Sequence, residues 1–309
     1  MIRIENLTKS FGLKKAVDDL SFSVERGEVL GFLGPNGAGK STTMRMITGF
    51  LPPTAGRISV GGHDVVEDAL AAKRLMGYLP ENAASYPDMS VEGFLGFAAE
   101  LRGLNGDAKK KAVHRVVDLC FLGSVLHQQI DTLSKGYRHR TCLAQSLIHD
   151  PEVLIMDEPT DGLDPNQKHE VRNLIREMGK TKAVIFSTHI LEEVGAACTR
   201  AIIIDRGRMV ANGTPEELRN MSELAGAVTI AAQNADAAKL SALPEALRVE
   251  AIDGALRVYP KDKSASVALA RSVMDLAGRE GWRVDALRTE EGQLDEVFRR
   301  ITLPDTVKK

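Results

Sequence analysis

Residues 34–42 read Gly-Pro-Asn-Gly-Ala-Gly-Lys-Ser-Thr, and this segment constrains the fold more than any other part of the chain. Its glycines, lysine and hydroxyl stand at the positions of a phosphate-binding loop, G-x4-G-K-[ST]. An apolar run at 29–33 precedes the segment, and a helical pattern at 41–48 follows it and stops at Gly49. Glycine suits such a loop because the backbone N–H groups must point inward along a path that a Cβ would block. A strand–loop–helix unit therefore fits these residues better than the alternative of an ordinary glycine-rich turn.

The residue types in the loop predict a site for a nucleoside triphosphate. Backbone N–H groups and the N-terminus of the following helix hold phosphates, and a lysine adds positive charge. We expect Lys40 to be that lysine and the Ser41 hydroxyl to face a Mg²⁺ ion. The loop residues predicted to bind the nucleotide are Gly34, Pro35, Asn36, Gly37, Ala38, Gly39, Lys40, Ser41 and Thr42.

Composition excludes several classes of protein. The 40 basic and 42 acidic side chains leave a formal charge of −2, so no polybasic field points to a nucleic-acid partner. Cys120, Cys142 and Cys198 lie too far apart for a zinc ribbon or a redox pair, and unpaired cysteines suit a reducing cytosol. No run of about 18 apolar residues occurs, and the first residues alternate as a strand does, unlike a signal peptide. We therefore expect a protein that neither spans a membrane nor leaves the cytoplasm unaided.

The first half of the chain predicts an antiparallel β part and an all-helical part. Segments 2–7 and 20–24 alternate apolar with polar residues, as half-buried antiparallel strands do, and 57–60 adds a further strand. From about 90 to 150 helical signals replace the strand signals, which indicates an inserted helical subdomain. The N-caps expected in this stretch are Ser90 and Asp107.

Continuous apolar strands that alternate with helices indicate a parallel sheet covered on both sides. The runs at 153–156, 183–186 and 201–204 have this character. Between the first two lies a helical pattern that we expect Gly179 to end. Together with the strand at 29–33, these runs predict an α/β core that the helical stretch interrupts.

A domain boundary is expected near Asn220. Beyond it strands and helices of short length alternate, which predicts a small α+β domain with its own core at 225–304. No catalytic constellation occurs there, so we interpret this domain as a packing, regulatory or docking module. Its strands are expected at 227–232, 247–252, 255–259 and 282–288, and its helices at 236–243, 265–278 and 293–301.

Two acidic residues and a histidine follow apolar strands, at the strand ends where open α/β sheets bind ligands. Asp157 follows the run at 153–156, and Glu158 projects to the other side of that strand end. We expect Asp157 to support Mg²⁺ and Glu158 to polarise water for attack on the γ-phosphate, the alternative being acidic residues that merely close a strand. His189 follows another strand, where an imidazole can hydrogen-bond the γ-phosphate.

The order of these motifs resembles that of the ATP-binding subunit of ABC transporters, over roughly residues 1–218. Residues 34–42 correspond to the family's Walker A loop, and 153–158 to its Walker B strand with the catalytic glutamate. Leu-Ser-Lys-Gly-Tyr at 133–137, in which Ser134 is a natural N-cap, corresponds to the signature motif.

Three further landmarks of the family are present in this sequence. Phe11 falls where the family stacks an aromatic ring on adenine, 159–164 corresponds to the D-loop, and His189 to the switch histidine. Two segments are similar to those of the efflux branch of the family, especially of subunits linked to gliding motility or multidrug export. They are Asp-Gly-Leu-Asp-Pro-Asn-Gln and the C-terminal Leu-Asp-Glu-Val-Phe-Arg-Arg-Ile-Thr.

The resemblance implies a P-loop NTPase core of the ABC ATPase type in domain 1–218, with an antiparallel β subdomain and a helical subdomain. It implies that two copies dimerise head to tail and hold two ATP molecules, each between one copy's Lys40 loop and the signature residues of the other. A separate membrane-spanning permease would grip the groove near Glu81 and the helical subdomain, so the chain would lie on the cytoplasmic face of the cell membrane and power export. The signature residues expected to bind ATP are Ser134, Lys135 and Gly136.

Three residues depart from the family pattern. Glu81 stands where most members have the Q-loop glutamine, and its carboxylate can still contact Mg²⁺ or water, so it stays a catalytic and metal-binding candidate. Lys135 replaces a signature glycine, where it would add charge near the nucleotide or point to solvent, and we favour solvent. Asp161 replaces a D-loop serine. None of these changes removes a core catalytic function, so we expect an active ATPase.

Two other functions fit part of this pattern. A soluble ABC-type ATPase acting on DNA or ribosomes usually carries a long coiled coil, zinc modules or two ATPase cassettes, none of which this sequence suggests. A regulatory module that senses ATP without turnover is disfavoured by the intact Glu158 and His189.

Overall fold

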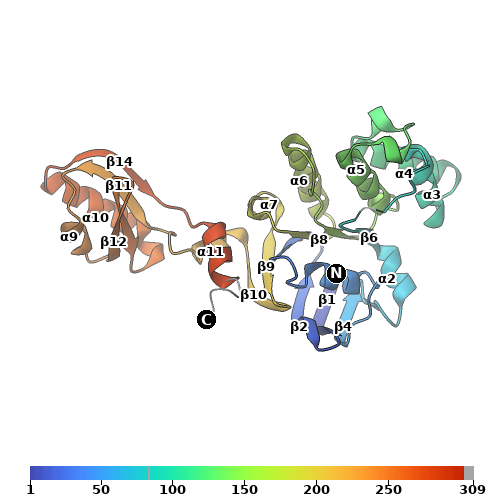
Figure 1. Ribbon diagram of the computed structural model, residues 1–309, viewed down its shortest axis with the longest axis horizontal. Helices are drawn as coiled ribbons and strands as arrows, with labels where there is room; N and C mark the ends of the chain where they lie inside the picture. Colours follow the sequence, from blue (N-terminus) through green and yellow to red (C-terminus); the bar gives the residue numbers. More distant parts are fainter. Residues whose placement is uncertain (83, 303–309) are drawn as a thin grey trace. The chain divides into compact units, whose positions relative to one another are not determined.

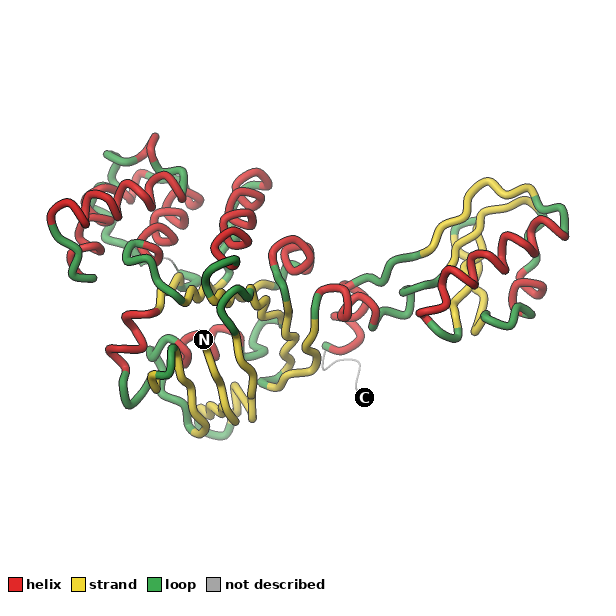
Figure 2. The backbone as a smooth tube through the Cα atoms, turned by 180° about the vertical axis from the view of Figure 1, so that it is seen from behind, coloured by secondary structure: helices red, strands yellow, loops and turns green. Residues whose placement is uncertain are grey.

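The computed structural model describes residues 1–82 and 84–302 of the chain (Figures 1 and 2). Contacts divide the chain into two compact units, Met1–Pro215 and Glu216–Lys309, which we describe separately. Residues 303 and 304 of the expected C-terminal domain lie outside the described residues. Within the described part, no helix combines the length and the apolar character needed to cross a bilayer.

The first unit contains an antiparallel sheet with the strand order β2-β1-β4-β5. The first two strands are longer than the alternation predicts, because register shifts interrupt the period of two and residues such as Asn6 and Asp19 adopt positive φ angles of 50° and 56°. The strands are β1 (Ile2–Phe11), β2 (Lys14–Val24), β4 (Ala55–Val60) and β5 (His63–Asp64).

A six-stranded sheet forms the centre of this unit, as the apolar runs predict. Its order is β10-β9-β3-β8-β7-β6, and all neighbours are parallel except the edge strand β10, which pairs antiparallel with β9. The strands are β3 (Val29–Leu33), β6 (Met76–Leu79), β7 (Val153–Asp157), β8 (Ala183–Thr188), β9 (Arg200–Asp205) and β10 (Arg208–Gly213).

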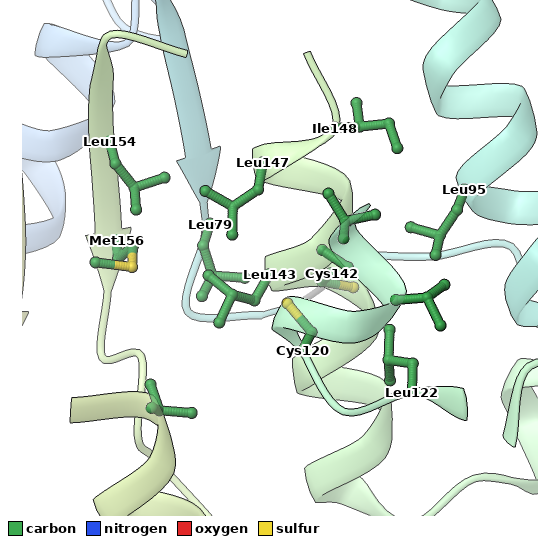
Figure 3. Close-up of a cluster of buried hydrophobic side chains, with 14 of the residues drawn as sticks. Leu79, Leu95, Cys120, Leu122, Cys142, Leu143, Leu147, Ile148, Leu154 and Met156 are labelled. Carbon is green, nitrogen blue, oxygen red and sulfur yellow. The ribbon is translucent and has the colours of Figure 1, made fainter. Parts of the chain in front are cut away.

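Successive residues of the central strands enter two different cores, which confirms the expected covering on both faces. On β7, Val153 and Ile155 join the core shared with the antiparallel sheet, whereas Leu154 and Met156 join the core shared with the helices. Figure 1 shows the helices α3 to α6 on one side of the central sheet and β1, β2 and β4 on the other. Figure 3 shows Leu154 and Met156 of β7 in one buried cluster with Leu143 and Leu147 of α5.

The helices of the first unit confirm the inserted helical subdomain. They are α1 (Lys40–Ile47), α2 (Ala69–Leu75), α3 (Val91–Leu101), α4 (Gly106–Leu119), α5 (Lys135–Leu147), α6 (Pro165–Gly179) and α7 (Leu191–Ala197), with short 3₁₀ turns at Gly123–Val125 and Ile130–Thr132. Ser90 caps α3 by accepting a hydrogen bond from the backbone N–H of Gly93 at 3.1 Å. The prediction for Asp107 was wrong, because α4 begins at Gly106 and Asp107 lies in its first turn, where a carboxylate still complements the helix dipole.

Gly179 is the last residue of α6, although it does not act there as a left-handed cap. A Cβ at Gly179 would lie 2.0 Å from Val29 Cγ2, so glycine is required for the close approach of α6 to β3. The helix ends where expected for a packing reason instead of a capping one.

The second unit confirms the order of elements expected beyond residue 225. Its sheet has the order β12-β13-β11-β14, and α10 packs on β11 and β14, as Figure 2 shows. Its core contains Val228, Val258 and Val273. The elements are β11 (Val228–Gln233), α9 (Ala237–Ser241), β12 (Ala246–Ile252), β13 (Ala255–Pro260), a 3₁₀ turn (Lys263–Ala265), α10 (Ser266–Arg279), β14 (Arg283–Thr289) and α11 (Leu294–Ile301), and α8 (Pro215–Asn220) lies at the junction.

Candidate functional site

A cleft of 470 Å³ opens at the carboxyl end of β3, where the phosphate-binding loop leads into α1. The structure brings together there Phe11, most of the loop, Glu81 and Glu158, which lie far apart in the sequence. Lys14 and Ala16 also line the cleft, and no motif had pointed to them. The full lining is Phe11, Lys14, Ala16, Asn36, Gly37, Gly39, Lys40, Ser41, Thr42, Glu81 and Glu158.

The loop needs its glycines for different reasons. A Cβ at Gly34 would lie 2.5 Å from the carbonyl oxygen of Ile204. Gly39 has a φ of +109°, and a Cβ there would lie 2.4 Å from the carbonyl oxygen of Ala16. Gly37 has open space around it, but its φ of +79° favours glycine. Close backbone packing and left-handed torsions together shape the loop.

Lys40 is buried at the base of the cleft, with 7% of its side chain exposed. Its Nζ donates to the carbonyl oxygens of Gly34 at 2.7 Å and Pro35 at 3.3 Å, and lies 4.0 Å from Glu158 Oε1. Burial lowers the pKa of Lys40, and the nearby carboxylates of Glu158, Asp157 and Glu81 oppose that shift. The ammonium group therefore stands among acidic groups with few contacts to water.

Asp157 and Glu158 leave the end of β7 in different directions. Asp157 is the buried last residue of the strand and accepts a hydrogen bond from Ser187 Oγ on β8. Glu158 has a φ of 54°, and its backbone N–H donates to the same Ser187 Oγ at 3.0 Å. This left-handed turn carries the Glu158 side chain into the cleft, in agreement with the expectation that it projects to the other side.

Glu158 and His189 form a close pair. His189 Nδ1 lies 2.9 Å from Glu158 Oε2, and 13% of the Glu158 side chain is exposed. Burial raises the pKa of Glu158, while the charges of His189 and Lys40 oppose the shift. The result is a partly desolvated carboxylate that faces the phosphate-binding loop.

The oxygen donors of the site fit Mg²⁺ held chiefly by phosphate oxygens and water. Ser41 and Glu81 line the cleft, and Asp157 is the buried last residue of β7, directly before Glu158. Among the described residues, no group of three His, Cys, Asp or Glu side chains could hold a metal by itself. Mg²⁺ typically takes one or two protein oxygens together with substrate phosphates, so this donor set suits it.

The signature residues lie outside this cleft. Ser134 caps α5 by accepting from the backbone N–H of Tyr137 at 3.3 Å, as its sequence position predicts. Ser134, Lys135 and Gly136 are absent from the residues that line the cleft. Lys135 has 63% of its side chain exposed, yet its Nζ pairs with Asp161 Oδ2 at 2.8 Å instead of pointing free into solvent. Two of the three departures from the family pattern, Lys135 and Asp161, are therefore partners.

Sequence reasoning missed two buried polar residues beside the site. Glu193 on α7 has 1% exposure and accepts hydrogen bonds from Thr160 Oγ1 and from Thr188 Oγ1, the latter at 2.7 Å. It thus joins the 159–164 loop to the end of β8. His139 on α5 is buried, and among the described residues neither of its ring nitrogens has a hydrogen-bond partner. No sequence motif marks either residue as part of a site. Glu193, for example, looks like an ordinary acidic residue in the first turn of a helix.

Comparisons with known proteins agree with this site. A family model described as ABC transporter matches residues 17–161. The chain is 40% identical over 220 residues to the linearmycin resistance ATP-binding protein LnrL of Bacillus subtilis, which covers 71% of this chain and 70% of that protein. It is 34% identical over 303 residues to the Nod factor export ATP-binding protein I of Ralstonia nicotianae, which covers 98% of this chain and 94% of that protein.

A solved structure of an ATP-binding subunit of an ABC transporter has the same fold. It superposes with a TM-score of 0.66 and 29% sequence identity, over 72% of this chain and 92% of that one. The predictions of fold class and family are thereby confirmed. The chain belongs to the ABC transporter family, as one of its ATP-binding subunits, which are ATPases.

Proposed function

We propose that two copies of this chain close head to tail around two ATP molecules, and that hydrolysis by Glu158 powers export through a separate membrane permease. The observation that carries the proposal is the Glu158 carboxylate, which lies 2.9 Å from His189 and 4.0 Å from Lys40 in the cleft of the phosphate-binding loop. Both curated relatives support the direction of transport, since one is named for export and the other for antibiotic resistance.

The residues of the cleft have distinct roles in this reaction. The loop N–H groups and Lys40 bind the β- and γ-phosphates, and Phe11, which is 52% exposed, offers a ring for the adenine. Ser41, Asp157 and Glu81 would hold Mg²⁺, which supplies positive charge to the phosphate oxygens when bound. Glu158 accepts a proton from the attacking water, and its raised pKa suits a base of this kind. His189 orients Glu158 and donates towards the γ-phosphate.

The need for a second copy follows from the position of α5. The cleft holds a nucleotide from one side only, and the capped N-terminus of α5 with Ser134 and Gly136 lies outside it. A helix N-terminus with free N–H groups is a site for phosphate. In a head-to-tail pair, this helix of one copy supplies donors to the nucleotide held by the other copy.

A second groove on the first unit, lined by Tyr78 and Arg102 but not by Glu81, suits the permease. It has a volume of 570 Å³ and contains the exposed side chains of Phe50, Leu70 and Leu101. Lys73 and Arg102 add positive charge, and no acidic residue occurs among the described residues that line the groove. We propose that it binds a short amphipathic helix with acidic residues from a cytoplasmic loop of the permease. The chain would then lie on the cytoplasmic face of the membrane.

Replacing Glu158 tests the catalytic proposal. The variant Glu158→Gln is expected to bind ATP and form a dimer, measured by light scattering on a size-exclusion column, while its phosphate release falls at least about a hundredfold. Lys40→Ala serves as the control, since it should bind no ATP and stay monomeric. Undiminished phosphate release by Glu158→Gln, or a monomer at saturating ATP, would refute the proposal.

Charge reversal tests the groove. Lys73→Glu should weaken co-sedimentation with membranes that contain a multi-span permease encoded beside this chain, because it repels an acidic helix. Val210→Glu, a change of a 40% exposed residue on β10, serves as the control and should leave co-sedimentation unchanged. Equal binding by both variants would remove the groove from the proposal.

A further inference from the structure

The two unusual residues of the signature motif and the D-loop meet in the folded chain. Lys135 Nζ lies 2.8 Å from Asp161 Oδ2, although the residues are 26 positions apart. The aliphatic part of the Lys135 side chain packs directly on Gly162, where a Cβ would lie 2.5 Å from Lys135 Cε. Gly162 also has a φ of +70°, which favours glycine for a second reason. An ion pair and close packing therefore join the N-terminus of α5 to the 159–164 loop.

A second glycine brings the same elements together. A Cβ at Gly136 would lie 2.3 Å from Gln167 Oε1, so the first turn of α5 packs directly against the first turn of α6. Asp164 caps that end of α6 by accepting from the backbone N–H of Gln167 at 2.9 Å. The contact between α5 and the loop is thus extended beyond a single pair of charges.

The ion pair continues into the turn that carries Glu158. The backbone N–H of Asp161 donates to the carbonyl oxygen of Glu158 at 3.1 Å. The hydrogen bond from Lys135 holds the pKa of Asp161 below its ordinary value. From Lys135 a continuous set of contacts therefore leads through Asp161 and Glu158 to His189.

We propose that the Lys135–Asp161 ion pair is a positioning contact that links the two nucleotide sites of the dimer. The inference rests on the proposed head-to-tail dimer, in which α5 of each copy contacts the nucleotide of the other copy. Glu158 of that same copy acts on the nucleotide in its own loop. One polypeptide then contacts both nucleotides, and movement of α5 at one site reaches the carboxylate at the other through Lys135 and Asp161.

Removing and exchanging the charges tests this role. Lys135→Ala and Asp161→Ala are each expected to lower kcat by up to about fivefold, the range for an exposed ion pair, and to bring the Hill coefficient for ATP towards one. The KM for ATP should change less than about twofold, because Asp161 holds the Lys135 ammonium and the phosphate-binding loop supplies most contacts to each nucleotide. The double variant should be no worse than either single one, and the exchange Lys135→Asp with Asp161→Lys should restore cooperativity.

A matched control separates this effect from a general loss of surface charge. Lys180→Ala removes another exposed pair, with Glu177 at 2.7 Å at the C-terminus of α6, and should leave kcat and cooperativity unchanged. Additive losses in the double variant, or an exchange that stays impaired, would overturn the proposal. A raised KM in Lys135→Ala with no effect of Asp161→Ala would overturn it in favour of direct phosphate contact by Lys135.

Failure of the dimer is a separate outcome. If Glu158→Gln stays monomeric with saturating ATP, the proposed function itself fails. If that variant dimerises and wild-type hydrolysis is cooperative, but Lys135→Ala keeps the wild-type Hill coefficient, only the role of the ion pair is overturned.

Discussion

Glu193 offers a direct test of how the 159–164 loop is held against the end of β8. Its carboxylate is 1% exposed and accepts hydrogen bonds from Thr160 Oγ1 and Thr188 Oγ1. A hydrogen bond to a charged group contributes about 1.5–3 kcal/mol, so the loss of both would cost about 3–6 kcal/mol. Removal of the desolvated charge offsets part of this loss. Glu193→Ala should therefore lower the free energy of unfolding of the first unit by about 3 kcal/mol.

The single tryptophan provides an internal reference for the measurement. Trp282 lies in the unit Glu216–Lys309, so its fluorescence reports the unfolding of that unit. Far-UV circular dichroism also reports the first unit, in which 1 kcal/mol shifts Tm by about 2–4 °C. Glu193→Ala should lower the dichroism transition by about 6–12 °C and leave the tryptophan transition unchanged.

Two further variants make the test specific. Glu192→Ala changes the exposed neighbour on α7 and should shift Tm by less than about 2 °C, as most surface changes do. Glu193→Gln keeps one carbonyl acceptor and should fall between the two alanine variants. If Glu193→Ala and Glu192→Ala melt at the same temperature, the two threonine bonds do not stabilise the loop and the reasoning is wrong.

Three other predictions concern the cleft and the core. Gly39→Ala should weaken ATP binding, measured by calorimetry, by more than about tenfold, because the new Cβ would clash and the left-handed backbone would be strained. Gly37→Ala should weaken binding less, because the space around Gly37 is open. Equal affinities of the two variants would contradict this. Burial raises the pKa of Glu158, and a general base, the role proposed for Glu158, acts when ionised. Hydrolysis should therefore fall as pH drops, through a midpoint above that of an ordinary glutamate, and a midpoint at or below the ordinary value would argue against that role. Burial raises the pKa of Cys120 and Cys142 to about 12, so both thiols should react with Ellman's reagent only on unfolding. Because Cys198 is a third, partly buried thiol, rapid reaction of two or more thiols in the folded protein would contradict their place in the core.

Local patterns predict the central strands well, because their physical cause is local. The run at 153–156 is wholly apolar, and in the structure every residue of β7 is buried between two cores. Asp157 then stands at the carboxyl end of that strand without any need for long-range information. The same reasoning brings Lys40 and Glu158 to one edge of the sheet, where they line one cleft.

Local patterns predict element ends less well, because the ends depend on distant partners. β1 runs to Phe11, beyond the predicted limit of residue 7, since its pairing with β2 continues through register shifts that disturb the alternation. Gly179 was expected as a cap, whereas its role depends on Val29, a residue 150 positions earlier in the chain.

The contacts around the turn at Glu158 show which features require the folded structure and cannot be predicted from the sequence. Read separately, Lys135 and Asp161 are two charged replacements at exposed positions, and an exposed lysine alone is well explained by solvent. They become one feature only because Gly136 and Gly162 let α5 approach the 159–164 loop closely enough for the charges to meet. Residues that depart from a family pattern in two motifs are therefore best interpreted together, after asking whether the fold brings them into contact.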